Sequence, residues 1–79
     1  MQQQAKYSLT ALTPRQQQIV ALIVEGCSNA EIADRLTLTP GTVANHLEHV
    51  MRRLGARNRV QVAVWAVEQG LLDRADGGR

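Results

Sequence analysis

Residues 43–54 carry polar side chains that can recognise the edges of DNA bases, spaced so that they share one side of a helix. An asparagine amide pairs with adenine through two hydrogen bonds, a glutamate accepts from the amino group of cytosine, and an arginine binds guanine or a phosphate. Asn45, Glu48 and Arg52 supply these three groups at intervals of three and four residues. These groups match the donor and acceptor patterns that base edges present in the major groove.

An apolar stripe on the same segment determines where these side chains point. At about 100° per residue, one side of the helix collects Val43, Leu47, Val50 and Leu54. The opposite side then presents Gly41, Asn45, Glu48, His49 and Arg52, with Ala44 on the flank. A second interpretation stays open, in which this is a solvated face where Glu48 and Arg52 form an i,i+4 ion pair.

Phosphate-binding groups are expected at helix starts, where free backbone amides and the positive end of the helix dipole attract anions. Asn29, Thr39 and Thr42 lie at such positions, although Thr39 can also act as a helix cap alone. One dense basic cluster follows, formed by Arg52, Arg53, Arg57 and Arg59. Such a cluster is typical of a nucleic-acid surface or of a solubilising face.

The residues predict neither catalysis nor metal binding. Cys27 is the single cysteine and has no base nearby in sequence, and the chain has no glycine-rich phosphate loop. His46 and His49 lack the i,i+4 spacing and the further ligands of a zinc site. We therefore predict no enzyme, no cofactor and no metal, with Cys27 as a small buried apolar residue and His46 as a partly buried packing residue.

Caps and glycines divide the chain into four predicted helices, over about 14–25, 29–35, 40–54 and 59–69. Each begins after a Ser, Thr or Asn, and the first two begin with capping boxes. The short second helix, a turn of about four residues and the longer third helix have the proportions of a helix-turn-helix. The sequence predicts an all-α four-helix bundle with a central helix-turn-helix.

Length and composition suit one small domain. We place it at residues 12–72, between a flexible arm or linker stub at 1–11 and a flexible tail at 73–79. The formal charge of +2 favours an anionic partner weakly, but eight of the nine basic residues are arginines, which hold phosphates through paired donors. No apolar run is long enough to cross a bilayer, and the lone cysteine suits a reducing compartment. We expect a cytoplasmic protein that does not contact membranes.

Several motifs at matching separations resemble the LuxR/FixJ/GerE family of DNA-binding domains. The family's Leu-Thr-x-Arg-Glu corresponds to 12–16, its Gly-x-Ser/Thr-Asn-x-Glu-Ile-Ala to 26–33, and its Thr-Val-x-x-His to 42–46. Its Lys/Arg-Leu-Gly corresponds to 53–55, and its following arginine to Arg59. The resemblance covers about three quarters of the chain.

This resemblance implies a four-helix domain whose third helix enters the major groove of double-stranded DNA and whose fourth helix mediates homodimerisation. It implies a transcription regulator, most often the output domain of a response regulator, with RNA polymerase as a further candidate partner. The expected DNA-binding residues are Asn29, Thr39, Thr42, Ala44, Asn45, Glu48, His49, Arg52, Arg53 and Arg57. Two alternatives stay open, namely a helical interaction module that has lost DNA binding and the promoter-binding domain of a sigma factor.

Three departures from the family pattern bear on these expectations. Gln16 and Gln18 stand where the family usually has glutamate, which removes ion pairs. Ala30 and Ala44 stand where many relatives carry lysine or another polar residue, and Glu48 replaces a frequent basic residue. The departures at Ala30, Ala44 and Glu48 bear on affinity and sequence preference.

The fourth helix is apolar on two sides. We expect the first stripe to face the core and the second to form the dimer contact. The first comprises Val60, Val64, Val67 and Leu71, and the second comprises Val62, Trp65, Ala66 and Gln69. In an alternative interpretation Trp65 folds over the edge of the core.

Overall fold

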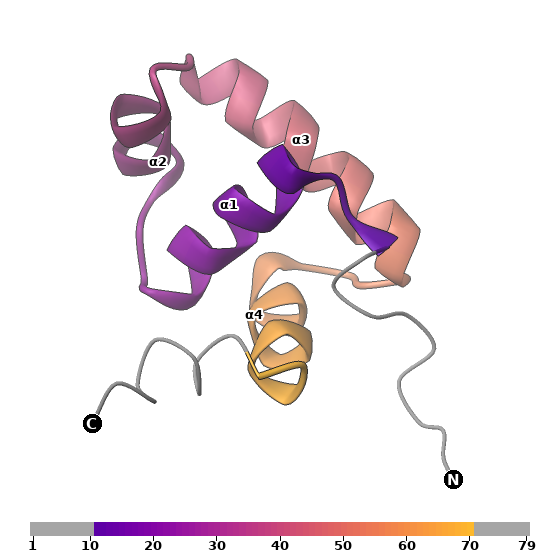
Figure 1. Ribbon diagram of the computed structural model, residues 1–79. Coiled ribbons are helices and arrows are strands. Elements are labelled where there is room, and N and C mark those ends of the chain that lie inside the picture. The colour runs from indigo at the N-terminus through magenta and orange to yellow at the C-terminus, as the bar shows by residue number, and fades with distance from the viewer. Residues whose placement is uncertain (1–10, 71–79) are drawn as a thin grey trace, which may run out of the picture.

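A computed structural model describes residues 11–70, which form four α-helices (Figure 1). These are α1 (Pro14–Val24), α2 (Asn29–Leu36), α3 (Pro40–Leu54) and α4 (Arg59–Glu68). The part of the chain that is described contains no strand. The predicted all-α class is confirmed, and the predicted helix ends differ from the observed ends by no more than one residue.

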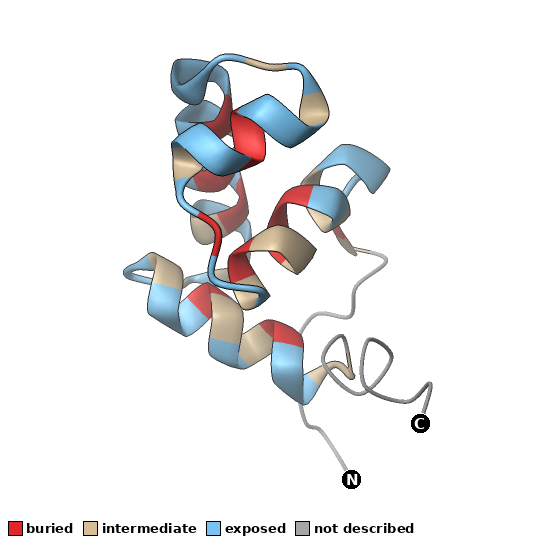
Figure 2. Cartoon of the chain, turned by 90° about the vertical axis from the view of Figure 1, so that its left-hand side faces the viewer, coloured by how far each residue is buried: buried red, intermediate tan, exposed pale blue. Residues whose placement is uncertain are grey.

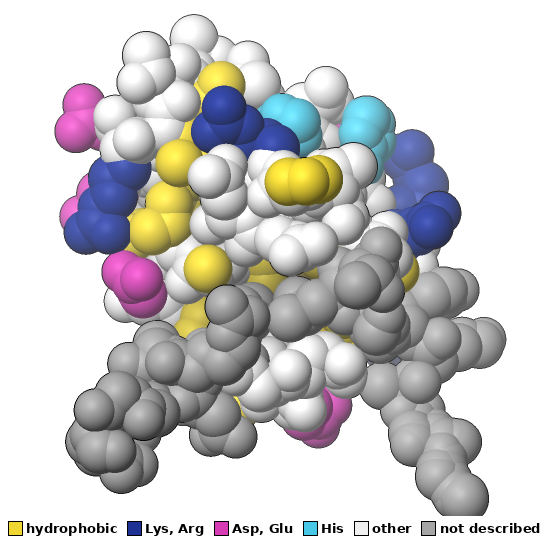
Figure 3. All heavy atoms as spheres, in the orientation of Figure 1, with side chains coloured by type: hydrophobic (Ala, Val, Ile, Leu, Met, Phe, Trp, Pro, Cys, Tyr) yellow, Lys and Arg dark blue, Asp and Glu magenta, His cyan; other side chains and the backbone are white. Residues whose placement is uncertain are grey.

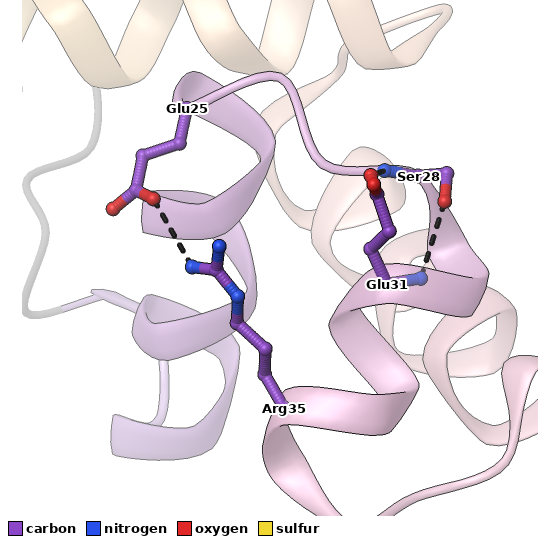
Figure 4. Close-up of polar contacts among 4 residues, drawn as sticks. All are labelled: Glu25, Ser28, Glu31 and Arg35. Carbon is purple, nitrogen blue, oxygen red and sulfur yellow. Dashed lines mark hydrogen bonds and ion pairs between the residues drawn. The ribbon is translucent and has the colours of Figure 1, made fainter.

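Side-chain caps explain why the helices begin where they do. The amide of Gln16 donates to Oγ1 of Thr13 at 3.1 Å, while the amide of Thr13 donates to Oε1 of Gln16 at 3.0 Å. Ser28 and Glu31 form the same reciprocal box at the start of α2, at 3.1 and 2.8 Å (Figure 4). Both predicted capping boxes are present, and each satisfies amides that the helix itself leaves without acceptors.

One apolar core joins all four helices. Its fully buried large side chains are Ile19 and Val20 of α1, Ile32 of α2, Val43 and Val50 of α3, and Val62 of α4. No polar or charged residue is buried among those described. Figure 2 shows the buried residues on the sides of the helices that face one another. The core therefore fixes the rotation of each helix about its own axis, which decides what each helix presents to solvent.

The helices α2 and α3 form the predicted helix-turn-helix. In Figure 1 the turn between them lies at one end of α3, while α1 lies between α3 and α4. The turn begins at Thr37, which adopts the left-handed conformation with φ 59° and ψ 49°. Glycine is usual at such a helix end, and a β-branched residue there is strained by about 1–2 kcal/mol.

We predict that Thr37→Gly stabilises the domain by about 0.5–1 kcal/mol, because the relief of left-handed strain exceeds the extra entropy that glycine has in the unfolded chain. Thermal unfolding followed by circular dichroism measures the change. Gly55→Ala is the matched control at the end of α3, where φ is 70° and an added Cβ would meet nothing within 4 Å. It should destabilise by about 1 kcal/mol. A lower melting temperature for Thr37→Gly would contradict the prediction.

The prediction of which side of α4 faces the core is wrong. Val62 and Ala66 are fully buried, whereas Val60, Val64 and Val67 are 66%, 52% and 38% exposed. Leu71, assigned to the same stripe as these exposed valines, lies outside the described residues. Valine and alanine occur on both sides of α4, so its periodicity carries no preference for one side. Packing against α1 and α3 determines which side of α4 faces the core.

Of the described helices, none is long and apolar enough to span a bilayer. The longest, α3, has 15 residues, against about 20 for a membrane-spanning helix.

Candidate DNA interface

The outward side of α3 carries the base-recognition candidates. Val43, Leu47 and Val50 are buried as predicted, and Leu54 is half-buried. Ala44, Asn45 and Glu48 are exposed and line a shallow hollow together with Thr39, Gly41 and Thr42. The structure thus brings together six neighbouring positions from the turn and the stretch of α3 up to Glu48.

Glu48 and Arg52 form the i,i+4 pair that the sequence left open. Nη2 of Arg52 lies 3.9 Å from Oε2 of Glu48, and the two side chains are 70% and 63% exposed. A solvent-exposed pair of this kind is worth about 0–1 kcal/mol. Both side chains can therefore leave this pair for DNA at little cost, and the pair also offsets the negative charge that Glu48 brings to this face.

The two threonines at the start of α3 cap the helix and each other. Oγ1 of Thr39 accepts from the amide of Thr42 at 3.1 Å, and the two hydroxyl oxygens lie 3.0 Å apart. Both residues are exposed. Their hydroxyls face the solvent side of the helix start, so capping and phosphate contact are compatible roles for them.

A second hollow lies between the start of α1 and the second half of α3. His49, Arg52 and Arg53 line one wall, and Ala11, Thr13 and Gln16 line the other. In Figure 3 histidine and arginine side chains gather over α3 on this side of the molecule. Within the described chain this wall of α3 concentrates the basic groups that a phosphate backbone attracts.

Arg59 does not belong to the exposed basic cluster in which the sequence placed it. Its Nη1 donates to Oδ1 of Asn29 at 2.9 Å, and its Nη2 donates to the carbonyl oxygen of Cys27 at 2.8 Å. Arg59 and Asn29 are half-buried. The sequence did not predict this contact because Asn29 and Cys27 precede Arg59 by 30 and 32 residues. The one sequence signal for this contact was that Asn29 and Arg59 both stand at positions of the family pattern.

Three acidic residues, Glu25, Glu31 and Asp34, lie at the end of α1 and on α2. Oε1 of Glu25 accepts from Nη1 of Arg35 at 3.3 Å, which ties these two helices together at the surface (Figure 4). Both side chains are more than half exposed, so this pair stabilises the fold weakly. Arg35 lines neither of the two hollows on α3.

The predicted dimerisation residues are not brought together on the surface. Val62 and Ala66 are core residues, and Trp65 and Gln69 are half-buried. Nε1 of Trp65 is buried without a hydrogen-bond partner in the described part of the chain, which agrees with the alternative that the ring covers the core edge. The exposed apolar surface is instead formed by Val24, Val60, Ala63, Val64 and Val67, with Glu68 at its border. We call these six residues the valine face.

The described residues contain no group of three or more His, Cys, Asp or Glu side chains that could hold a metal ion. Cys27 is buried, as the sequence predicts for a small apolar residue.

The fold and the exposed face of α3 define a helix-turn-helix domain. Residues 10–66 match the luxR family of bacterial regulatory proteins, and the chain belongs to that family. This membership confirms the predicted resemblance, and it agrees with the prediction of a regulator and not an enzyme.

Individual relatives support the assignment. The chain is 40% identical over 61 residues to the nitrate/nitrite response regulator protein NarL of Escherichia coli, and 38% identical over 60 residues to the DNA-binding transcriptional activator DevR/DosR of Mycobacterium tuberculosis. These alignments cover 77% and 76% of this chain but 28% of each relative. A protein of Mycobacterium bovis is 45% identical over 60 residues, which are 7% of its length. The chain therefore spans less than a third of these relatives.

Proposed function

We propose that this domain binds double-stranded DNA in a sequence-specific manner as part of a cytoplasmic transcription regulator, with α3 in the major groove. The observation that carries the proposal is the rotation of α3, which buries Val43, Leu47 and Val50 and leaves Asn45 and Glu48 exposed beside the turn. An α-helix fits the major groove, and in a helix-turn-helix the second helix supplies the base contacts. The similarity to NarL, a nitrate/nitrite response regulator protein, and to DevR/DosR, a DNA-binding transcriptional activator, supports the same role in regulation.

The bases that these side chains suit follow from their hydrogen-bonding groups. Asn45 pairs with adenine through its amide, and Ala44 offers a methyl group that packs against the methyl of thymine. Glu48 accepts from the amino group of cytosine, and Arg52 reaches guanine or a phosphate. Because Glu48 repels every phosphate near it, its contribution to affinity depends on the base it meets.

Phosphate contacts are proposed for the residues that surround this face. Thr39 and Thr42 stand at the start of α3, Asn29 stands at the start of α2, and His49, Arg53 and Arg57 lie toward the end of α3 or just beyond it. These contacts position the domain on the duplex and carry no sequence information of their own.

We further propose that two copies associate through the valine face of α4. Three exposed valines in one patch favour a contact surface. A two-fold dimer through this face would place two α3 helices for half-sites about one helical turn apart. RNA polymerase is a further partner to test.

We predict that Arg53→Gln weakens binding to all duplexes to a similar degree and flattens the dependence of log affinity on log salt concentration by about one unit. Arg53 is exposed and lines the hollow between α1 and α3, so its loss removes a phosphate contact and no core contact. Fluorescence anisotropy of selected and scrambled labelled duplexes at several salt concentrations measures both quantities.

The matched control is Arg35→Gln, which removes the same charge from an exposed position beside Glu25. It should change the salt slope much less. If wild-type binding does not weaken as salt rises, the domain does not bind DNA as proposed, and the interaction-module alternative takes its place. Equal salt slopes for the two variants would remove Arg53 from the interface.

A further inference from the structure

The Arg59 side chain connects the first turn of α4 to the first turn of α2. Its guanidinium donates to Oδ1 of Asn29 and to the carbonyl oxygen of Cys27, at 2.9 and 2.8 Å. Asn29 is the first residue of α2, and Cys27 directly precedes the Ser28 cap. Both acceptors lie where the helix-turn-helix begins, so the contact fixes the start of α2 against a helix outside that motif.

The contact also fixes the orientation of the Asn29 amide. Arginine has donors and no acceptor, so the amide can offer only its oxygen to Arg59. Its two N–H groups are then directed away from the guanidinium. In the described part of the chain these N–H groups meet no protein acceptor, and they are not among the buried atoms that lack a partner. The described residues therefore leave these donors available to another partner.

We propose that Arg59 is a positioning residue for DNA binding, which holds Asn29 so that its amide N–H groups donate to a backbone phosphate. This inference rests on the proposed function and deepens it. Ser28 takes the amide of Glu31, so the backbone amides of Asn29 and Ala30 stay without intrahelical acceptors beside the same donors. Without Arg59 the side-chain amide of Asn29 turns freely and presents its donors in no fixed direction.

A double-mutant cycle separates this role from a direct phosphate contact. We expect Asn29→Ala and Arg59→Met each to weaken binding about three- to tenfold, the effect of one ordinary hydrogen bond, on selected and scrambled duplexes alike. The double variant should bind no more weakly than the weaker-binding single variant, because both changes remove one contact. Arg35→Met provides the control for loss of one positive charge from the surface.

The dependence of log affinity on log salt concentration distinguishes a direct phosphate contact of Arg59 from a positioning role, because a positioning role leaves this slope unchanged. Asn29 is neutral, so the slope for Arg59→Met should match that of Arg35→Met, whereas a direct Arg59–phosphate contact would flatten it by about one further unit. Asn29→Asp keeps the acceptor for Arg59 and removes the donors. It should hold the wild-type melting temperature and yet weaken binding more than Ala30→Asp, which adds the same charge one residue away.

The outcomes are distinguishable. Independent effects that multiply in the double variant, or a slope for Arg59→Met flattened beyond the control, would overturn the positioning role while leaving DNA binding intact. A melting temperature for Asn29→Asp as low as that of Arg59→Met would overturn the hydrogen bond on which it rests. Absence of salt-dependent binding by the wild-type chain would overturn the proposed function and this inference with it.

Discussion

Val62→Asp should unfold the domain, whereas Val64→Asp should leave it folded and unable to self-associate. Val62 is fully buried in the core, while Val64 is 52% exposed on the valine face. An aspartate at position 62 loses the burial of a valine, worth about 1.5–3 kcal/mol, and places an unpaired charge in an apolar site at a cost of several kcal/mol. A chain of 79 residues has a total stability of about 4–12 kcal/mol at about 0.05–0.15 kcal/mol per residue.

Circular dichroism and sedimentation velocity measure the two properties separately. Val62→Asp should lose its helical signal and its cooperative melting transition. Val64→Asp should keep both, sediment as a monomer with and without DNA, and bind a duplex with two half-sites about as it binds one with a single half-site. A folded Val62→Asp variant would contradict the observed core. A Val64→Asp variant that still associates as the wild type does would remove the valine face as the dimer contact.

Asn45→Ala should reduce affinity for the preferred duplex by about 1–3 kcal/mol, which corresponds to roughly five- to 150-fold, and should leave binding to scrambled DNA nearly unchanged. Asn45 is exposed and has no side-chain hydrogen bond within the described residues that this change would break. Its removal therefore acts on base recognition and not on folding. Titration of a selected and a scrambled duplex at one fixed salt concentration measures the ratio of the two affinities.

Gln18→Ala is the matched control, because Gln18 is also an exposed amide residue but lies on α1. It should change neither affinity nor the ratio. A fall in binding to both duplexes by the same factor would assign Asn45 to the phosphate backbone. No change on either duplex would place Asn45 outside the interface.

The helix boundaries were predictable because local chemistry determines them. The caps at Thr13 and Ser28 and the glycines at positions 26 and 55 act within one turn of the chain. The helix ends that they set can therefore be predicted without tertiary structure. The rotation of α3 was also predictable, because its apolar residues occupy one side only. The left-handed conformation of Thr37 was not predictable, because the turn into α3 requires it and threonine itself does not favour it.

The rotation of α4 and the contacts of Arg59 could not be predicted from the sequence. Because α4 has valines on both sides, either side could face the core. Packing against α1 and α3 buries the side that carries Val62. Arg59 stands two residues after Arg57 in the basic cluster formed by Arg52, Arg53, Arg57 and Arg59. Whether each arginine points to solvent or back to the start of α2 depends on contacts across about 30 residues, which spacing along the chain does not encode.

The separation between the buried and exposed sides of α3 has an evolutionary consequence. Ala44, Asn45 and Glu48 are exposed and belong to no part of the core, so selection on folding places almost no constraint on them. Under the proposed function, substitutions there would alter which promoter is recognised without first requiring a compensating, stabilising mutation. Duplicated copies of such a domain can therefore diverge toward new target sequences by single steps, each of which leaves a folded protein.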